Sequence, residues 1–399
     1  MGTSRSINIR RSILFVMGLF LKSPSRIYLD WNATAPLTPG AREAWTGALD
    51  LGWANANSLH IEGKAAAALL EDARERIASL TGVSAGEWIF TSGGTESIHA
   101  ALYGCLPARG GRRRIVSSQG EHACTRAILD DLEARGFEVV RVGLSATGHW
   151  DPDEVIEACD PSCTALATLI WAHNETGAVS DVQSVASRLR ERRIPLHLDA
   201  VQVPGRLPFD LSALPVSFVS ISGHKFGAPK GIGGLFVRRA SPWRRWMLGG
   251  EQERGRRSGT SNVAGAQAMA TALAEAFAAD FPSLERCRDA FEERLEATVP
   301  GMFRIGAGPR LPQTSLLRFE GVESAPLLLR LDDRGFAVSS GSACTAGRTD
   351  PSPSLLAMGL SAHQAHGALR VSFGCGTPED ALERLAEVLA EEIPVLRRV

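Results

Sequence analysis

Seven residues decide the fold: Ala165-Leu166-Ala167-Thr168-Leu169-Ile170-Trp171. This stretch is apolar without the alternation of a strand that has one face in water, so it predicts a strand buried on both faces of a parallel sheet. Further short strands are predicted on either side of it, at residues 87–90, 114–117, 139–142, 196–199 and 217–220. Helical spacing predicts helices beside them, at 62–80, 95–103 and 123–134. This alternation indicates an α/β fold with helices on both faces of the sheet.

The pattern changes after about Asn262. A long alanine-rich helical region extends to about Ala297, past Pro282, and the strands that follow it are fewer, at 315–319, 336–339 and 369–373. We therefore expect two domains, a large one at 41–262 and a smaller α+β one formed by 25–40 with 263–399.

Residues 1–24 contain a short apolar run from Ile13 to Leu21, which follows Arg10 and Arg11. This run is too short to span a bilayer, and no typical small-residue cleavage site follows it. We interpret residues 1–24 as a leader or, in better agreement with these features, as a disordered extension or as sequence upstream of a true start at Met17. No other apolar stretch reaches membrane length, so no membrane association is expected.

The chain has 399 residues with 43 basic and 44 acidic side chains, for a net charge of -1. A protein that binds nucleic acid through its phosphates is normally more basic, so no direct nucleic-acid partner is expected, and the run Arg109–Arg114 is interpreted as a solvated loop. Seven irregularly spaced cysteines indicate free thiols in a reducing compartment, which predicts a cytoplasmic protein. His363 and His366 lack a third ligand, so no metal site is expected.

Only four of the basic residues are lysines: Lys22, Lys64, Lys225 and Lys230. Lys225 follows the predicted strand 217–220 in Ser222-Gly223-His224-Lys225, and ligand sites of open α/β folds lie at the carboxyl ends of strands. A lysine amine there suits a Schiff base with an aldehyde cofactor, which an arginine cannot form. The alternative is an ordinary surface lysine in a turn.

Two further stretches suit an anionic cofactor with a basic ring. Thr91-Ser92-Gly93-Gly94-Thr95 joins a strand to a helix start, where backbone N–H groups and a hydroxyl form an anion seat. The alternative is a plain N-cap at Thr95. Asp199 ends the predicted strand 196–199, and a buried carboxylate is costly unless it is paired. A protonated pyridine nitrogen would be such a partner, and the alternatives are a helix cap or an internal salt bridge.

Two residues of the C-terminal part are candidates for contact with a substrate. Cys344 lies in the loop from Ser339 to Gly347, whose small residues leave a thiol accessible, as a reactive cysteine requires. The alternative is a structural cysteine. Arg370 lies inside the predicted strand 369–373, where its guanidinium needs an anion such as a carboxylate. The alternative is an intramolecular ion pair.

Together these motifs resemble those of the cysteine desulfurases, pyridoxal 5′-phosphate (PLP) enzymes of the class V aminotransferase group, over nearly everything from Ile27 to about Glu391. The matching stretches also include Tyr28-Leu29-Asp30 with Ala33-Thr34, Glu121-His122, Asn174-Glu175, Asp199-Ala200-Val201-Gln202, and Gly249 to Glu253 with Arg257 to Thr260. The form of Ser339 to Thr345 resembles the group I branch, to which sulfur donors for iron–sulfur clusters and tRNA thiolation belong. The resemblance implies PLP fold type I, with a mostly parallel seven-stranded sheet between helices in the large domain.

By position, the resemblance also implies a PLP site on this chain. Lys225 would bind the cofactor, Asp199 would keep its pyridine nitrogen protonated, and Gln202 would contact its phenolic oxygen. His122 would stack on the ring and move protons. The phosphate would be held by Gly94, Thr95, Ser222 and His224, and Thr260 would reach the phosphate of a neighbouring copy, which implies a homodimer.

The reaction follows from the same resemblance. Asn174 and Arg370 would hold the carboxylate of L-cysteine, and Cys344 would attack its sulfur, form a persulfide and leave L-alanine. The sulfur would then pass to a protein acceptor, an iron–sulfur scaffold or a thiolation enzyme. Two alternatives stay open: a selenocysteine lyase or other β-eliminating PLP enzyme, and a catalytically silent scaffold in sulfur trafficking.

Some positions depart from the usual pattern of this family. Gly94 stands where alanine is common, a change expected to be harmless. His173 precedes Asn174 where a second asparagine is usual, and Cys375 follows Gly374 where arginine is frequent. None of these removes a group with an implied role, but His173 and Cys375 are candidates for tuning the choice of substrate or acceptor.

Overall fold

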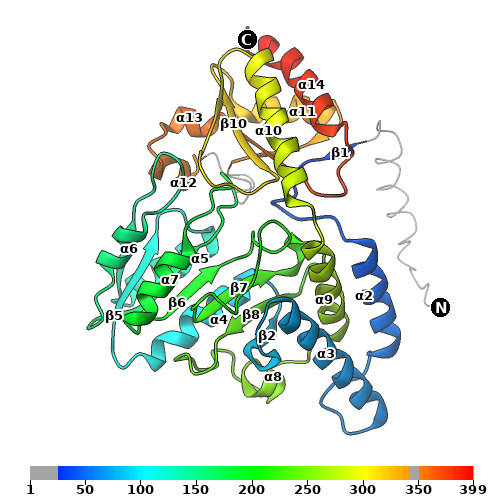
Figure 1. Cartoon of the computed structure of the whole chain (residues 1–399), viewed down its shortest axis with the longest axis vertical. Helices are drawn as coiled ribbons and strands as arrows, with labels where there is room; N and C mark the ends of the chain where they lie inside the picture. The colour runs from blue at the N-terminus through cyan, green and yellow to red at the C-terminus, as the bar shows by residue number, and fades with distance from the viewer. Residues whose placement is uncertain (1–25, 342–349, 399) are drawn as a thin grey trace, which may run out of the picture.

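The structure, a computed structural model, describes residues 26–341 and 350–398 (Figure 1). Within these residues the main sheet has seven strands in the order β2-β8-β7-β6-β5-β3-β4. In chain order they are β2 (Trp88–Thr91), β3 (Arg114–Ser118), β4 (Glu138–Val142), β5 (Thr164–Ile170), β6 (Leu196–Asp199), β7 (Phe218–Ser222) and β8 (Gly233–Val237). β8 is antiparallel to both neighbours and the other pairs are parallel, which confirms the mostly parallel seven-stranded sheet.

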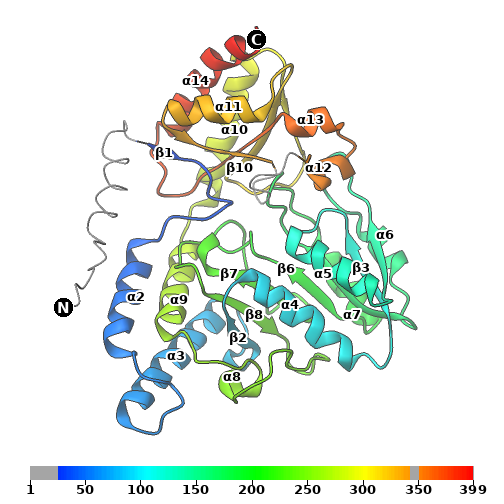
Figure 2. The same cartoon turned by 180° about the vertical axis from the view of Figure 1, so that it is seen from behind.

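The strand that decides the fold is β5, which lies between β6 and β3 and is buried at every position. Leu166 and Ala167 are successive residues of β5 and belong to different core clusters, because successive side chains of a strand point to opposite faces. One face is covered by α4 (Gly94–Cys105) and α5 (Ala123–Ala134), as Figure 2 shows from behind. The other is covered by α3 (Ile61–Leu80), α6 (Pro152–Ala158), α7 (Val182–Glu191) and α9 (Val263–Phe277). Helices therefore cover both faces, as predicted.

A smaller group of elements follows α9 along the chain. Its antiparallel sheet has the order β12-β13-β10-β9, formed by β9 (Met302–Arg304), β10 (Thr314–Phe319), β12 (Ser339–Ser340) and β13 (Ala368–Ser372). β1 (Ile27–Tyr28) pairs in parallel with β11 (Phe336–Ala337), so the first described residues join the C-terminal elements. The helices of this group are α10 (Phe281–Thr298), α11 (Ser324–Asp333), α12 (Pro353–Ala357), α13 (Ala362–His366) and α14 (Ala381–Leu396).

Two further helices and three 3-10 turns complete the described elements. They are α2 (Pro39–Leu51), α8 (Gln252–Gly255), and turns at Ala85–Glu87, Leu106–Ala108 and Gly223–Lys225. No helix among the described residues is long and apolar enough to cross a membrane.

The alanine-rich region after Asn262 differs from its prediction as one continuous helical stretch. It forms two helices, α9 and α10, that are separated at residues 278–280. Asp280 caps α10, since its side chain accepts a hydrogen bond from the Ser283 N–H, and Pro282 lies in the first turn of α10, where a missing N–H costs nothing. The predicted strand 336–339 is likewise two strands, because β11 pairs with β1 whereas β12 pairs with β13.

Candidate active site

A cavity of about 290 Å³ opens at the carboxyl ends of β6 and β7, next to the N-terminal ends of α4 and α5. This is where a doubly wound α/β sheet places its ligands. The cavity is lined by Ala33, Gly94, Thr95, Ile98, His122, Ile170, Ala172, Asn174, Asp199, Val201, Gln202, Ser222, His224 and Lys225. Nine residues with a predicted role in the site thus meet in one place, although they come from distant parts of the chain.

The start of α4 supplies the part of this cavity suited to an anion. The helix begins at Gly94 with Gly93 as its N-cap, so Thr95 lies in the first turn instead of capping the helix. The first N–H groups of a helix have no partner within it, and they attract negative charge. A Cβ atom on Gly94 would lie 2.8 Å from Val201 Cγ2 and 3.4 Å from Ser222 Cβ, so glycine allows a close approach of helix and strand here.

Lys225 is held over the cavity by the segment that connects β1 to α2. Its Nζ donates hydrogen bonds to the carbonyl oxygens of Asn32 (2.6 Å) and Ala33 (2.9 Å). His224 joins the same segment through Nδ1 and Thr34 Oγ1, which are 3.1 Å apart. The residues between β1 and α2, near the beginning of the described chain (Figure 1), therefore position the lysine.

Asp199 and Gln202 place buried polar atoms against the cavity. Asp199 accepts one hydrogen bond within the described residues, from the Val201 N–H at 3.0 Å, and burial raises its pKa to about 6 although Lys225 opposes the shift. Gln202 donates from Nε2 to Asn32 O at 2.9 Å, while its Oε1 is buried with no partner in the described part of the chain. Buried polar atoms are normally paired, so both side chains are suited to contacts with a ligand.

His122 lies at the other wall, at the start of α5, and Glu121 precedes it in the chain. His122 caps the helix by accepting the Cys124 N–H at Nδ1 (3.2 Å). Burial, followed by the charges of Lys225 and Arg126, lowers the His122 pKa to about 4, so the ring is neutral at pH 7. Because Nδ1 accepts, the neutral ring carries its proton on Nε2. Glu121 accepts from Ser118 Oγ (2.6 Å) and the Ile170 N–H (2.9 Å), and burial raises its pKa to about 8.

Arg370 lies beside the cavity without lining it. In β13 it forms an ion pair with Asp30 (Nη2 to Oδ1, 2.7 Å), and its Nη1 donates to Asn174 O at 2.9 Å. Its Nε is buried with no hydrogen-bond partner among the described residues. The guanidinium thus has an internal carboxylate, while one N–H still lacks an acceptor.

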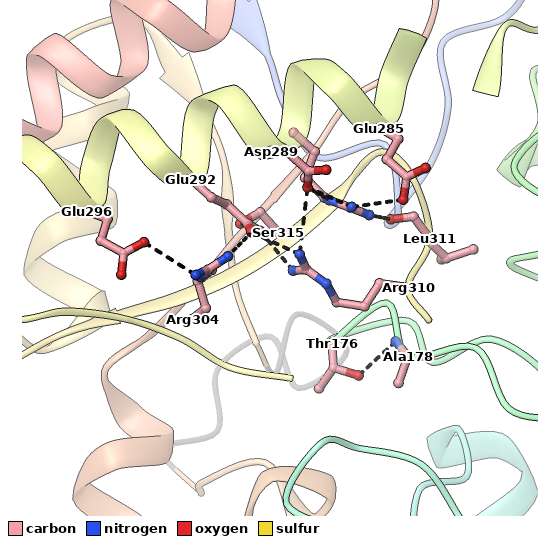
Figure 3. A network of polar contacts seen from close by, with 11 residues as sticks. Thr176, Ala178, Glu285, Asp289, Glu292, Glu296, Arg304, Arg310, Leu311 and Ser315 are labelled. Atoms are coloured by element: carbon pink, nitrogen blue, oxygen red, sulfur yellow. Dashed lines mark hydrogen bonds and ion pairs between the residues drawn. The ribbon is translucent and has the colours of Figure 1, made fainter. Parts of the chain in front are cut away.

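The loop that carries Asn174 is tied to the C-terminal elements (Figure 3). Ala178 forms an isolated β-bridge with Arg310, and the Leu311 N–H donates to Gly177 O at 2.7 Å. The Arg310 guanidinium is in turn fixed by Glu292 of α10, which accepts from Nη1 (2.8 Å) and Nη2 (2.9 Å). This network connects the position of Asn174 to the packing of α10.

Some predicted residues lie elsewhere. Thr260 is exposed and does not line the cavity, and Cys344 lies outside the described residues. Asn32, whose carbonyl accepts hydrogen bonds from both Lys225 and Gln202, and Asp30 have no role predicted from the sequence. Asp30 belongs to the family motif Tyr28-Leu29-Asp30, which could have indicated it, whereas Asn32 lies outside the matching stretches. No group of three or more potential metal ligands occurs within residues 26–341 and 350–398.

Comparison with known proteins agrees with this geometry. The family described as "Aminotransferase class-V" matches this chain over residues 27–385. A cysteine desulfurase from Nostoc sp. is 38% identical over 94% of this chain and 94% of its own length. Among solved structures, a NifS-like protein superposes with a TM-score of 0.86 at 30% identity, covering 93% of this chain and 100% of its own. The structure "SspA in complex with cysteine" superposes with a TM-score of 0.78 at 30% identity, covering 87% of this chain and 99% of its own.

The chain belongs to the aminotransferase class-V family. Within that family it is an enzyme of the cysteine desulfurase type that depends on PLP, and its fold is the PLP fold type I implied by the sequence. The alternatives of a selenocysteine lyase, another β-eliminating enzyme or a silent scaffold are not favoured by these relatives.

The cavity fits this cofactor on its own chemistry. PLP carries a phosphate, which the N-terminal end of α4 at Gly94 suits. Its ring nitrogen is a base that becomes a cation when protonated, and the buried carboxylate of Asp199 is its natural partner. Lys225 lines the cavity, and a lysine amine is the group that binds an aldehyde.

Proposed function

We propose that this enzyme converts L-cysteine to L-alanine and carries the sulfur as a persulfide on Cys344 for transfer to a protein acceptor. The observation that carries the proposal is the convergence of Lys225, Asp199 and His122 on one cavity. The similarity to a solved structure titled as a complex with cysteine supports the choice of substrate.

The residues that we propose to bind this chain's own PLP all line the cavity. Lys225 binds the aldehyde of PLP, Asp199 pairs with the ring nitrogen, and Gln202 contacts the phenolic oxygen. Gly94, Thr95, Ser222 and His224 hold the phosphate, and all four line the cavity. PLP supplies the electron-withdrawing ring that stabilises a carbanion next to the amino group of the substrate.

Proton movement is assigned to groups of this chain. Lys225 Nζ accepts and returns a proton beside the substrate, since the Asn32 and Ala33 carbonyls hold it at the cavity. His122 is neutral and carries its proton on Nε2, so Nε2 can donate a hydrogen bond to a group in the cavity. Burial disfavours the charged form of the ring. Its fixed Nδ1 contact with the Cys124 N–H keeps the ring orientation constant.

We assign the substrate carboxylate to Asn174 and Arg370. Asn174 lines the cavity directly. Arg370 has a buried Nε without an acceptor in the described residues, and its ion pair with Asp30 holds the guanidinium in one orientation until the carboxylate arrives.

We further propose a homodimer. Large apolar side chains are exposed around the connection of α2 to α3, with exposed fractions of 73% for Trp53, 87% for Leu59 and 78% for Ile61. Exposed apolar groups of this size mark surfaces that bind a partner. Thr260 is exposed as well, in agreement with a contact to the phosphate of the second copy.

The protein acceptor is proposed to be an iron–sulfur scaffold or a tRNA thiolation enzyme. We propose that the enzyme transfers sulfur to it in the cytoplasm. The six cysteines of the described residues are all free, which supports a reducing compartment.

The test is incubation of the purified holoenzyme with L-cysteine, followed by quantification of alanine and mass spectrometry of the protein. We expect one alanine per sulfur released and a persulfide on Cys344. Cys344→Ala should retain the visible absorbance of bound PLP and lose desulfurase activity, and Lys225→Ala should lose both. Cys287→Ala, a change at an exposed free cysteine of α10, is the matched control and should keep full activity. Pyruvate and ammonia as main products, or a colourless protein, would contradict the proposal.

A further inference from the structure

A second cavity lies at the opposite end of the main-sheet strands from the active site. It measures about 290 Å³ and is formed where β6 and β7 begin, at Leu196 and Phe218, and where the antiparallel β8 ends, at Val237. The active site lies where β6 and β7 end, at Asp199 and Ser222. The full length of these strands therefore separates the two cavities.

The charge of this cavity has one sign. Its lining includes five arginines and, among the described residues, no aspartate or glutamate: Arg109, Arg190, Arg193, Arg238 and Arg239. By contrast, the lining of the active-site cavity includes Asp199, and that of the adjoining cavity includes Glu87. The net charge of the whole chain is -1, so this concentration of positive charge is local.

The five arginines also differ from many others in this chain by lacking an ion pair with a carboxylate in the part that the structure describes. Arg109 Nε donates to Ala165 O at 2.8 Å, and Arg238 Nε donates to Val216 O at 2.8 Å. These carbonyls fix the two guanidinium groups without neutralising them. Glu87 lines the adjoining cavity, accepts the backbone N–H of Arg239, and interacts electrostatically with Arg238 without forming an ion pair with it.

The backbone of the cavity is strained as well. Arg193 (φ 55°) and Ala240 (φ 68°) adopt left-handed conformations, and both line the cavity. Such conformations are unfavourable for residues with a Cβ atom and persist where the surrounding structure holds them, often at binding sites. Here they turn two loops so that Arg193 and Arg239 border the same space.

We propose that this cavity binds a compact phosphate-bearing anion, either free diphosphate or the phosphate end of a nucleotide. Guanidinium groups bind phosphate oxygens in bidentate geometry, and several of them without carboxylate partners favour a ligand with more than one negative charge. The volume suits a small group better than a drug-sized ligand. The site is separate from the PLP phosphate seat and does not depend on the proposed reaction.

The experiment is calorimetric titration of the PLP-saturated holoenzyme with sodium diphosphate, with ATP, and with sodium acetate at matched ionic strength. We expect saturable binding of diphosphate with a dissociation constant below about 1 mM, and no saturable binding of acetate. If ATP binds at least as tightly, the natural source is a nucleotide; if ATP fails to bind, it is free diphosphate. Both results support the site.

The variant for this test combines Arg193→Gly, which suits the left-handed backbone, with Arg239→Ala. Neither side chain has a role in the reaction, so PLP absorbance and desulfurase activity should stay unchanged. Diphosphate binding should weaken by about tenfold or more, since two charge-assisted contacts are lost. The matched control is Arg286→Ala, an exposed arginine of α10 with no ion pair among the described residues. Unchanged binding in the double variant, or an equal loss in Arg286→Ala, would overturn the proposal.

Discussion

Two buried carboxylates, Glu292 of α10 and Asp199 of the active site, have opposite surroundings. Glu292 is 0% exposed and accepts three hydrogen bonds, two from Arg310 and one from Ser315 Oγ at 2.8 Å. Asp199 is 4% exposed and accepts one within the described residues, from the Val201 N–H. A buried charge needs a counter-charge. Glu292 finds its own inside the fold, whereas Asp199 is left for a ligand to complete.

This difference separates scaffold from site in an enzyme that is rich in arginine. The bidentate pair of Arg74 with Glu253 repeats the Glu292 arrangement on the other side of the molecule. In both pairs the charge is satisfied before any ligand binds. The comparison therefore predicts that changes at Glu292 affect the folded state in every condition, and that changes at Asp199 depend on the cofactor.

The largest expected effect is that of Glu292→Ala on stability. Removal of the carboxylate takes both short hydrogen bonds from the buried Arg310 guanidinium and leaves it the more distant Asp289, at 4.0 Å, so the free energy of unfolding should fall by about 3–5 kcal/mol, with and without PLP. Denaturant unfolding of apoprotein and holoenzyme measures this. Glu296→Ala, which removes an exposed carboxylate from the same helix, is the control and should cost less than about 1 kcal/mol. A loss confined to the holoenzyme would contradict the comparison.

Asp199→Asn should have the next largest effect, on activity. Without the negative charge beside the ring nitrogen, the turnover rate should fall by about 100- to 1000-fold, as for other fixed groups that stabilise charge in a transition state. Steady-state alanine production measures the rate, and the visible absorbance of the protein reports whether PLP is still bound. Turnover within a few fold of wild type, with PLP bound, would contradict the role of Asp199.

Although Asp199→Asn should lower activity, the same change should raise the stability of the apoprotein. The folded-state pKa of Asp199, about 6, lies above its ordinary value of 3.8 because burial disfavours the charge. Between these values the folded state binds more protons than the unfolded state, so stability falls as pH rises from about 4 to about 6 and stays lower above that. The difference corresponds to about 3 kcal/mol.

Asp199→Asn should therefore stabilise the apoprotein at pH 8 by up to about 3 kcal/mol, and should not do so at pH 4. Thermal unfolding of the cofactor-free protein at both pH values measures this. Glu253→Gln is the control, because it removes one charge of a satisfied pair and should destabilise the apoprotein at pH 8. A destabilised Asp199→Asn apoprotein at pH 8 would show that the carboxylate is already satisfied within the chain.

The sequence indicates the active-site residues more clearly than the buried ion pairs of the scaffold. Asp199 ends one short strand and Lys225 follows another, so their place at the carboxyl end of the sheet can be predicted from contiguous residues. The contact of Lys225 with Asn32 joins positions 193 residues apart and depends on how the segment before α2 crosses the sheet. No local pattern encodes such a contact.

The scaffold side is harder still to predict. Glu292 is one of several acidic residues on a helix of mixed charge, and its burial depends on the packing of Arg310 and Ser315 against α10. The break between α9 and α10 shows the same limit. Alanine favours helix throughout this region, and only the cap at Asp280 and the proline after it indicate where the second helix begins.

The smallest predicted effect concerns Gly94, at the wall of the cavity. A Cβ atom there would lie 2.8 Å from Val201 Cγ2, and valine is stiff about χ1, so Gly94→Ala forces the start of α4 away from Val201, which follows β6. We expect a loss of about 1–3 kcal/mol, divided between stability and PLP affinity. Val201→Ala removes the contact atom, so the double variant should regain most of the loss, and a double-mutant cycle on thermal unfolding and PLP dissociation measures the coupling. Additive effects would mean that the anion seat tolerates alanine without Val201 moving. Coupling in PLP affinity would mean that the ligand, rather than the scaffold, sets the spacing of helix and strand at this wall.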